Sequence, residues 1–361
     1  MAHPTLYISI TNHGFGHATR AAAVAATVQA LMPEVRLILA TTAPRWLLQG
    51  YVKDFIYRPR AFDVGVIQQD SIQMDLPATL KQLHHLQGME AALAAEEAAF
   101  LREMGVQLVL GDIPPMAVSI AHAAEVPCWL MSNFGWDFIY RPWSGEFIAV
   151  ADWIGERFGA CDRTFRLPFH EPMAAFPVIE DVGLTGGEPR FSEAQLRSHY
   201  QITAPKENLV LLTFGGLGLQ KIPYAGLTRF PDWQFITFDS SAPDLPNLRK
   251  INGHQLRPVD WMPFCGRVIS KPGFSTFAEA CRQDLPIVTI TRDDFAEAKI
   301  LLKGIADHAY HQILPPESFF TGDWEFLSAP LTPPRQGSQC LDKDGNLQIA
   351  QAVVDYLQSD R

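Results

Sequence analysis

The chain has 361 residues, of which 47% are hydrophobic and 19% charged, and its formal net charge at pH 7 is -10. This length is enough for two domains of ordinary size. The acidic balance argues against a nucleic-acid partner, which usually meets a basic face, and disfavours tight docking on anionic lipid, although peripheral membrane contact stays open. The five cysteines form no C-x-x-C pair, so we expect neither a disulfide framework nor a zinc site.

The start of the chain has no basic segment followed by an apolar run, and no uninterrupted apolar stretch reaches about 18 residues. We therefore expect no secretory signal and no integral membrane segment. A reducing cytoplasm is the simplest setting for the scattered cysteines, and we expect a cytoplasmic protein.

Short apolar runs alternate with helical patterns along the first half of the chain. We predict strands at residues 6–10, 37–42, 106–110 and 127–132 and helices at 21–31, 78–103 and 116–124. This alternation is typical of an α/β protein with a doubly wound parallel sheet.

The stretch 168–207 is rich in proline, glycine and charge, so we place the domain boundary there. The alternation then restarts, with strands predicted at 209–214, 234–238, 268–270 and 286–290 and helices at 274–281 and 346–358. Two Rossmann-like domains facing across a cleft are expected. We assign an N-terminal acceptor-side domain to 1–185, a linker to 186–205, a C-terminal donor domain to 206–340, and a final helix that packs back on the N-terminal domain to 341–361.

The loop after the first predicted strand, residues 11–20, reads Thr-Asn-His-Gly-Phe-Gly-His-Ala-Thr-Arg. A strand, a glycine turn and a helix in this order place polar groups at the carboxyl edge of a parallel sheet, where open α/β proteins bind ligands. Glycine lets the backbone approach a ligand, and a helix N-terminus favours negative charge. A plain turn with solvent-facing histidines is the alternative.

A second pattern lies in the C-terminal half, where Lys271, Gly273, Ser275 and Thr276 follow a predicted strand and open a helix. The amides, hydroxyls and ammonium of such a segment suit an anion. Glu279 falls one helical turn after Thr276, on the same face, where a carboxylate can accept hydrogen bonds from two ribose hydroxyls. A plain helix cap with Glu279 in solvent is the alternative.

Gly273, Thr276, Glu279 and Pro286 match the donor-site pattern of the GT-B glycosyltransferases. The chain resembles the branch of the peptidoglycan lipid-intermediate N-acetylglucosaminyl transferase, whose Gly-Gly-His turn is similar to Gly16-His17. A tighter resemblance, over residues 6 to about 357, is to the glycosyltransferase-like N-terminal region of plant-type L-arabinokinases. It rests on the string from His13 to Arg20, the segment 133–140 and the Phe-Gly-Gly turn at 214–216. The resemblance does not include the sugar-kinase domain, so it does not imply kinase activity.

The resemblance implies a site for a nucleoside-diphosphate sugar, most simply a UDP-sugar. Glu279 would hold the ribose, and the diphosphate would lie on the amides after Gly273. The other implied donor-site residues are Gly215 and Gly216, Lys271, Ser275, Thr276, Asp293, Asp294 and Glu297. Lys271-Pro272 replaces the small residues more usual in the family, and acids stand where Gln or Asn is common, so the identity of the sugar stays open.

Inverting transfer to a hydroxyl needs a group that takes the proton of the attacking acceptor. We expect His17 to be this base and Asp112 to orient it, since a carboxylate fixes the tautomer of a histidine and raises its basicity. Asp137 and His13 are the alternative bases. His17 could instead donate to a phosphate or to the backbone, and Asp112 could instead cap a helix.

The acceptor, a glycan, lipid or small molecule that carries a hydroxyl, is expected on the first turn and the aromatic run 134–143, because sugar C–H faces pack on aromatic rings. Burial of these rings in the core is the alternative. The residues expected at this acceptor side of the cleft are His13, Gly14, Gly16, Thr19, Arg20, Asn133 and Trp136.

The sequence contains no Asp-x-Asp at a strand end, and adjacent side chains such as Asp293 and Asp294 diverge in an extended segment. We therefore expect no metal and no cofactor, with the leaving-group charge met by helix amides, hydroxyls and either Lys271 or Arg20. The combined prediction is a metal-independent inverting glycosyltransferase of hexosyl or N-acetylhexosaminyl type. A sugar-nucleotide-binding sensor without turnover and a sugar-nucleotide epimerase are the alternatives.

Overall fold

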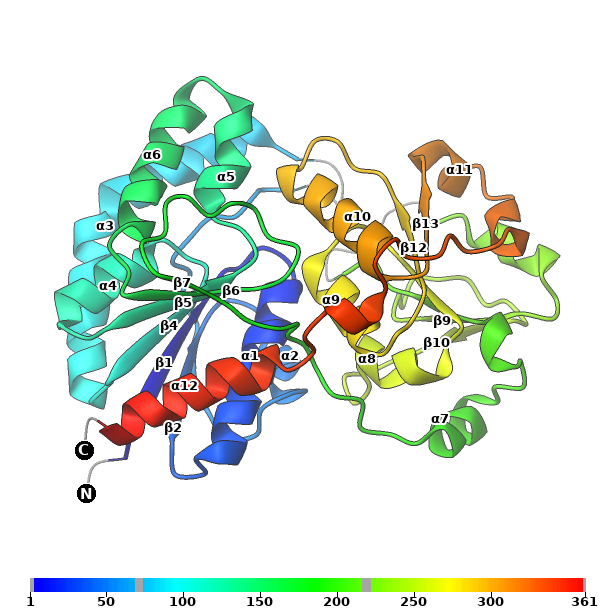
Figure 1. Cartoon of the computed structure of the whole chain (residues 1–361), viewed down its shortest axis with the longest axis horizontal. Helices are drawn as coiled ribbons and strands as arrows, with labels where there is room; N and C mark the ends of the chain where they lie inside the picture. Colours follow the sequence, from blue (N-terminus) through cyan, green and yellow to red (C-terminus); the bar gives the residue numbers. More distant parts are fainter. Residues whose placement is uncertain (1–2, 69–73, 216–221, 360–361) are drawn as a thin grey trace. The chain divides into compact units, whose positions relative to one another are not determined.

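The computed structural model describes residues 3–68, 74–215 and 222–359. The chain divides into two compact units. The first contains the described residues up to Gly186 together with the C-terminal segment from Asp342, and the second contains Gly187–Leu341. Each unit is built around one parallel sheet, as Figure 1 shows.

The first unit has a seven-stranded sheet in the order β3-β2-β1-β4-β5-β6-β7, with every neighbouring pair parallel. The order turns at β1, whose neighbours β2 and β4 lie on either side. Its strands are β1 (Thr5–Ile10), β2 (Arg36–Ala40), β3 (Ile56–Arg58), β4 (Leu108–Asp112), β5 (Cys128–Ser132), β6 (Arg163–Arg166) and β7 (Ile179–Asp181).

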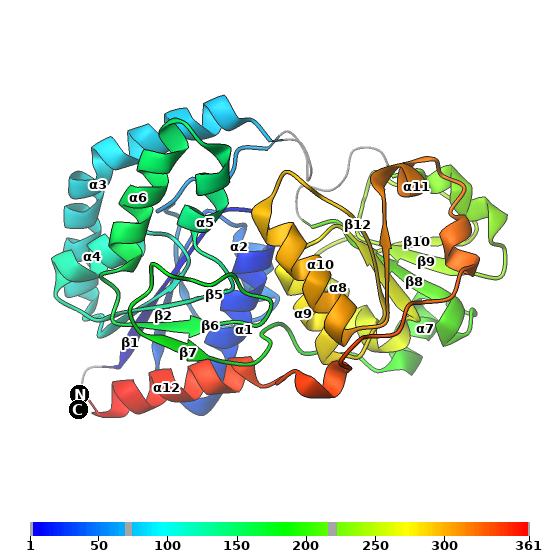
Figure 2. The same cartoon turned by 45° about the horizontal axis from the view of Figure 1, so that its top comes forward.

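Helices cover both faces of this sheet, which explains why every residue of its central strands β1, β4 and β5 is buried. On one face α3, α4 and α6 pack together, and on the other α12 lies along α1 (Figures 1 and 2). The helices of the unit are α1 (Gly16–Leu31), α2 (Arg45–Gln49), α3 (Leu76–Met104), α4 (Met116–Ala124), α5 (Trp136–Tyr140), α6 (Glu146–Phe158) and α12 (Gly345–Ser359).

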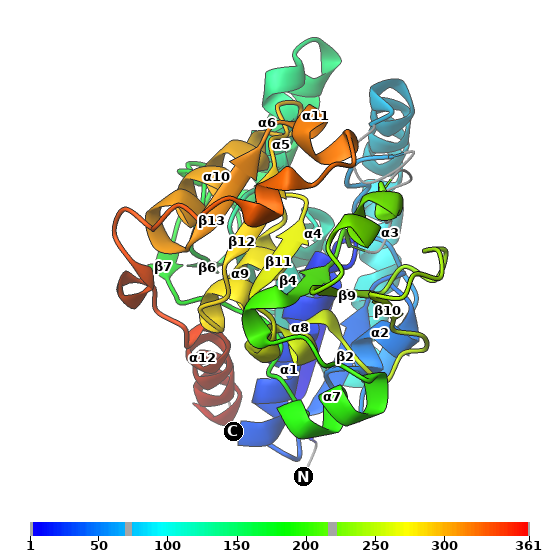
Figure 3. The same ribbon diagram turned by 90° about the vertical axis from the view of Figure 1, so that its right-hand side faces the viewer.

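The second unit has a six-stranded parallel sheet in the order β10-β9-β8-β11-β12-β13, which Figure 3 shows with its helices. Its strands are β8 (Leu209–Leu212), β9 (Gln234–Thr237), β10 (Leu248–Lys250), β11 (Arg267–Ser270), β12 (Ile287–Ile290) and β13 (His311–Leu314). Its helices are α7 (Glu193–Tyr200), α8 (Pro258–Trp261), α9 (Phe274–Arg282), α10 (Ala296–His308) and α11 (Pro316–Phe320).

The predicted fold class, two parallel α/β sheets, is confirmed. Each of the strands and helices named from the sequence has an observed counterpart, with ends that differ by a few residues. The largest difference is at α1, which begins at Gly16 rather than residue 21, so that His17 and Arg20 lie on the helix. No described helix is both long and apolar enough to cross a membrane.

Candidate active site

The first turn of the N-terminal unit, residues 11–15, follows β1, the strand at which the strand order of the sheet reverses. Ile10 pairs with Asp112, so the ends of β1 and β4 are neighbours at the carboxyl edge. Gly14 has φ +72°, a left-handed conformation that glycine adopts readily. Gly16 opens α1, and Thr19 Oγ1 donates to the carbonyl of Gly16 at 2.9 Å. Thr19 therefore supports the helix turn that carries His17.

His17 and Asp112 form a buried pair. Nδ1 of His17 lies 2.8 Å from Oδ1 of Asp112, and the two residues are 7% and 0% exposed. Burial disfavours the charged imidazole, and the positive charge of Arg20 adds to this effect, so the pKa of His17 is lowered despite the neighbouring carboxylate. The predicted pair thus exists, and its histidine is neutral at neutral pH.

Arg20 lies beside this pair and is itself 2% exposed. Its Nε donates to Oδ2 of Asp112 at 2.7 Å, and its Nη2 donates to Oδ1 at 2.5 Å. Burial alone would raise the pKa of Asp112, but the charge of Arg20 and the hydrogen bonds from Arg20 and His17 outweigh it and the pKa is lowered. Sequence reasoning expected Arg20 to meet the acceptor or the leaving group. The buried, bidentate guanidinium contradicts that role.

The hydrogen bonds also fix the tautomer of His17. Arg20 Nη2 lies 3.0 Å from Nδ1, but this amino group also lies within reach of Asp112 Oδ1 and of Ser132 Oγ at 3.2 Å, which can take its two hydrogens. An unprotonated Nδ1 would turn its lone pair toward the Asp112 carboxylate. The proton therefore sits on Nδ1 and is donated to Asp112, which leaves Nε2 as the proton acceptor.

His13 has the opposite tautomer. The backbone N–H of Val66 donates to Nδ1 of His13 at 3.2 Å, so in the neutral ring the proton sits on Nε2. Its ring meets Trp136 edge-on with centroids 5.3 Å apart. Gly65 packs so closely that a Cβ there would lie 2.7 Å from Cβ of His13. His13 can donate through Nε2, but it is not arranged to act as a base, in contrast to His17.

The aromatic run after β5 is part of the core. Trp136 is 0% exposed, and its ring stacks on Tyr140 with centroids 5.5 Å apart. Asn133 is 1% exposed and accepts from Nη1 of Arg20 at 2.9 Å. The expectation that Trp136 and Asn133 touch the acceptor is therefore wrong, because both side chains are buried. Phe15 and Trp46 were not singled out from the sequence as candidate site residues. Their rings meet edge-on with centroids 5.8 Å apart, and Trp46 is 37% exposed.

Asp63 is a buried carboxyl that sequence reasoning also missed. Its Oδ2 accepts from Nε1 of Trp136 at 3.1 Å, and its Oδ1 accepts from the backbone N–H of Asn12 at 3.4 Å. Burial raises the pKa of Asp63 to about 6. Asp63 thus joins the first turn to α5. The signal in the sequence was a lone acid between Phe62 and Val64, which resembles an ordinary loop residue.

Asp137, the other alternative base, lies on the first turn of α5. Burial raises its pKa, and its Oδ1 is buried without a hydrogen-bond partner among the described residues. Glu171 accepts from the backbone N–H groups of Gly135 and Met173, and the negative charge of Asp137 adds to the effect of burial in raising the pKa of Glu171. Among the residues that the structure describes, Asp137 has no orienting partner comparable to that of His17.

The predicted donor residues of the second unit gather at the ends of β8 and β11, which are neighbouring strands. Gly215 follows β8 with φ +77°, and a Cβ on it would lie 3.7 Å from Cε of Lys271. Gly273 is the N-cap of α9 and gives it no side-chain cap. Ser275 is buried and Thr276 is half-buried in the first turn. Gly216 lies outside the described residues.

Glu279 points into the protein rather than into solvent. It is 6% exposed, and its Oε1 accepts from the backbone N–H of Gly187 at 2.9 Å. Burial raises the pKa of Glu279 to about 7, although the Gly187 bond and the charges of Arg257 and Arg282 oppose the shift. The carboxyl is therefore poised between its two protonation states near neutral pH.

The acids after β12 separate into two kinds. Asp293 and Asp294 are exposed, and Asp294 accepts from Nε of Arg292 at 3.0 Å, whereas Glu297 is buried in the first turn of α10. Within the described ranges, no group of three or more His, Cys, Asp or Glu is placed to hold a metal ion.

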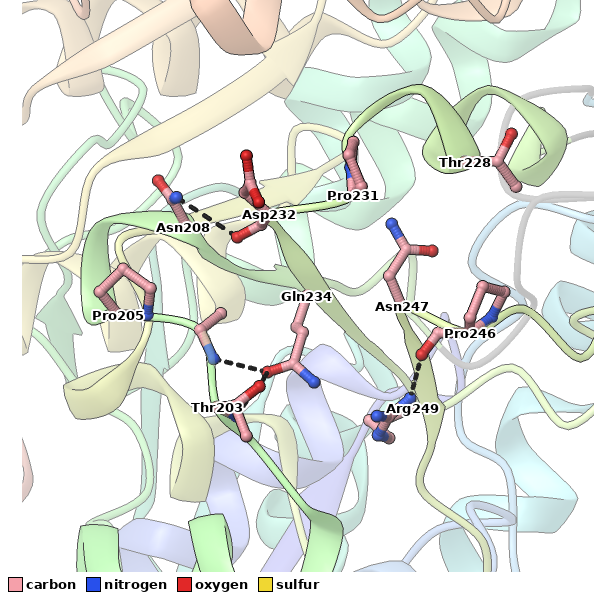
Figure 4. A pocket seen from close by; sticks show the side chains of 11 residues that line it. Thr203, Pro205, Asn208, Thr228, Pro231, Asp232, Gln234, Pro246, Asn247 and Arg249 are labelled. Atoms are coloured by element: carbon pink, nitrogen blue, oxygen red, sulfur yellow. Dashed lines mark hydrogen bonds between the residues drawn. The ribbon is translucent and has the colours of Figure 1, made fainter.

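A pocket of about 570 Å³ in the second unit lies away from these residues, at the amino ends of β8, β9 and β10 (Figure 4). Its polar side chains hold backbone groups: Gln234 accepts from the N–H of Ala204 at 2.7 Å, and Arg249 donates to the carbonyl of Pro246 at 2.8 Å. Ligands of open α/β sheets bind at the opposite, carboxyl edge. We therefore assign this pocket to loop packing.

No protein-family model matches the chain. A curated relative, L-arabinokinase of Arabidopsis thaliana, is 28% identical over 310 residues, which are 81% of this chain. The chain spans 28% of the length of that relative.

Solved glycosyltransferase structures share the fold. The calicheamicin glycosyltransferase CalG4 matches with a TM-score of 0.64 and 14% identity over 98% of both chains. Phytolacca americana UGT2, solved with UDP-2-fluoro-glucose and pterostilbene, matches with a TM-score of 0.60 and 12% identity over 99% of this chain and 94% of the other. A UDP-glucose:anthocyanidin 3-O-glucosyltransferase with UDP matches with a TM-score of 0.58 and 11% identity over 99% of both chains. The chain has the GT-B glycosyltransferase-like fold.

Proposed function

We propose that this protein is a GT-B glycosyltransferase that moves a sugar from a nucleoside-diphosphate sugar, most simply a UDP-sugar, to an acceptor hydroxyl with inversion and without a metal ion. The observation that carries this proposal is the His17–Asp112 pair at the carboxyl edge of the first sheet, with its proton on Nδ1 and its acceptor nitrogen on Nε2. A neutral, oriented imidazole with a free acceptor nitrogen can take the proton of an attacking alcohol.

In the proposed step, the acceptor oxygen attacks the anomeric carbon while Nε2 of His17 takes the hydroxyl proton. The bond between the anomeric carbon and the diphosphate oxygen breaks, and the nucleoside diphosphate leaves with the electron pair. Asp112 holds the imidazole through Nδ1 and stabilises the imidazolium that forms.

The donor would be held by the second unit. The amides and hydroxyls at the start of α9 and the ammonium of Lys271 suit a diphosphate, because they combine hydrogen-bond donors with positive charge. Glu279 would accept from the ribose hydroxyls in its ionised form, and Asp293, Asp294 and Glu297 would meet the sugar. These same cationic and dipolar groups would stabilise the leaving diphosphate, which is our reason for proposing a metal-independent reaction.

The test is to incubate the wild-type protein with a panel of nucleotide sugars and hydroxyl acceptors, with and without EDTA. We expect release of nucleoside diphosphate that needs an acceptor and persists in EDTA. NMR of the product should show the anomeric configuration opposite to that of the donor.

Other results would assign other functions. Binding of nucleotide sugars without release, across the acceptors, would indicate a sensor, an idea that the similarity to part of an arabinokinase also supports. Conversion of a nucleotide sugar without any acceptor would indicate an epimerase. Retention of configuration would refute the role of His17 as the base of a single displacement.

A further inference from the structure

Arg20 adds a cation to the His17–Asp112 pair. It lies three residues after His17 on α1, so both side chains leave the same side of the helix. Its guanidinium spans Asp112, with Nε 2.7 Å from Oδ2 and Nη2 2.5 Å from Oδ1. The other donors reach the end of β5, at Asn133 Oδ1 and Ser132 Oγ. The guanidinium is thus fixed against the ends of both β4 and β5.

The charges of this cluster decide which group carries a proton. A fully buried carboxylate without a cation draws a proton onto the imidazole beside it, because the resulting ion pair relieves the buried charge. Here Arg20 already neutralises Asp112. A proton on His17 would add a second positive charge to a ring whose Nδ1 lies 3.0 Å from Nη2 of Arg20.

The two aromatic rings described beside His17 carry no formal charge. The rings of Phe134 and Trp136, from the segment after β5, lie with centroids 5.7 and 6.4 Å from the imidazole. Asp63, another buried acid of the unit, is bonded to the indole nitrogen of Trp136. The balance between Asp112 and Arg20 therefore controls the imidazole.

We propose that Arg20 is a positioning residue that keeps Asp112 ionised and His17 neutral, so that the carboxylate orients the imidazole without protonating it. The catalytic meaning of this inference rests on the proposed function. The protonation state itself exists without substrate and can be measured in a protein that shows no turnover.

The test is a pH titration of the protein labelled with ¹⁵N-histidine, followed by NMR, with the signals of His17 identified by their loss in His17→Gln. In the wild type we expect a neutral ring with its proton on Nδ1 and a pKa below the ordinary value of about 6.5. Arg20→Met should raise the pKa of His17 by about 1–3 units. Arg20→Lys keeps a positive charge but loses the two parallel hydrogen bonds to Asp112, so it should raise the pKa of His17 by a smaller amount. This variant replaces Arg20→Met in the test if Arg20→Met does not fold.

Arg58 offers a matched control in the same unit. Its guanidinium also holds a buried carboxylate through two bonds, Nε to Glu97 Oε1 at 3.0 Å and Nη2 to Oε2 at 2.8 Å. Arg58→Met should lower stability and leave the pKa of His17 unchanged. An unchanged pKa of His17 in the Arg20 variants, or an equal shift in Arg58→Met, would overturn the proposal.

Turnover separates this inference from the proposed function. If the wild type is active, Arg20→Lys should move the acidic limb of the kcat/KM profile to higher pH, by the same amount as the pKa of His17. A merely structural role would lower kcat/KM equally at every pH and would also overturn the proposal. A shifted pKa in a protein without activity would refute the glycosyltransferase while leaving the role of Arg20 intact.

Discussion

Asp112 in the first unit and Glu279 in the second are both buried carboxyl groups at predicted binding edges, yet their pKa values move in opposite directions. Asp112 is 0% exposed and its pKa is lowered, whereas Glu279 is 6% exposed and its pKa is raised to about 7. The two carboxyl groups differ in their hydrogen-bond partners. The guanidinium of Arg20 binds both oxygens of Asp112, whereas Glu279 accepts from the N–H of Gly187. Burial alone does not set the charge of a carboxyl group, because a guanidinium bonded to both of its oxygens can keep it ionised.

This contrast separates two kinds of site. The charged groups around His17 are held in place by hydrogen bonds within the fold, so the proposed base is neutral and oriented before any ligand binds. Glu279 must stay ionised to accept two ribose hydroxyls, and its ionisation changes near neutral pH. We therefore expect the chemistry of the first unit to depend on its hydrogen-bond network, and nucleotide binding by the second unit to depend on pH.

The largest expected effect comes from breaking the fixed network at Asp112. Asp112→Asn removes the charge that orients His17 and leaves Arg20 without its carboxylate. We expect the rate of nucleoside-diphosphate release to fall by about 10²–10⁴-fold, with a lower melting temperature. An Asp112→Asn protein with wild-type turnover would show that the pair is only structural.

The second prediction concerns the contribution of the Trp136 side chain to the stability of the first unit. Because its ring is fully buried, Trp136→Ala should lower the free energy of unfolding by about 3–5 kcal/mol, measured by urea denaturation. Trp46→Ala is the matched control, since Trp46 is 37% exposed and should change stability by less than about 1 kcal/mol. Equal effects of the two substitutions would contradict the placement of Trp136 in the core.

Asp63 provides a buried carboxyl without a guanidinium in the first unit. Its pKa is about 6 in the folded chain and 3.8 in the reference state, so the folded chain binds its proton more tightly. Raising the pH from about 4 to about 6 should therefore lower the free energy of unfolding, by on the order of 1–3 kcal/mol. Asp63→Asn should remove this contribution, whereas substitution of the exposed Asp54 should not. Parallel stability profiles for Asp63→Asn and the wild type would contradict this assignment.

A smaller effect is expected at Glu279. If its carboxylate holds the ribose, the affinity for UDP should increase by about tenfold between about pH 6 and 8, as the carboxyl ionises. Glu279→Gln should remove this part of the pH dependence and leave the part that comes from the titration of UDP itself. Identical pH profiles in calorimetry would refute the role of Glu279.

The sequence alone was sufficient to predict the two parallel sheets and the pairing of His17 with Asp112. Strand periodicity and the common edge of parallel strands are local rules, and each of the two residues follows a predicted strand in the chain. The same rules could not distinguish a ring on the surface from a ring in the core, and they misplaced Trp136. They also could not show that Arg20 turns inward, because this depends on Asp112 and Asn133, which lie far away in the sequence.

The central claim, that the first unit supplies the base and the second holds the nucleotide, is tested most directly by measuring turnover and UDP affinity together in His17→Ala and Glu279→Ala. We expect His17→Ala to lose turnover by about 10²–10⁴-fold with unchanged UDP affinity, and Glu279→Ala to bind UDP more weakly. Wild-type turnover in His17→Ala, or wild-type UDP affinity in Glu279→Ala, would contradict the account.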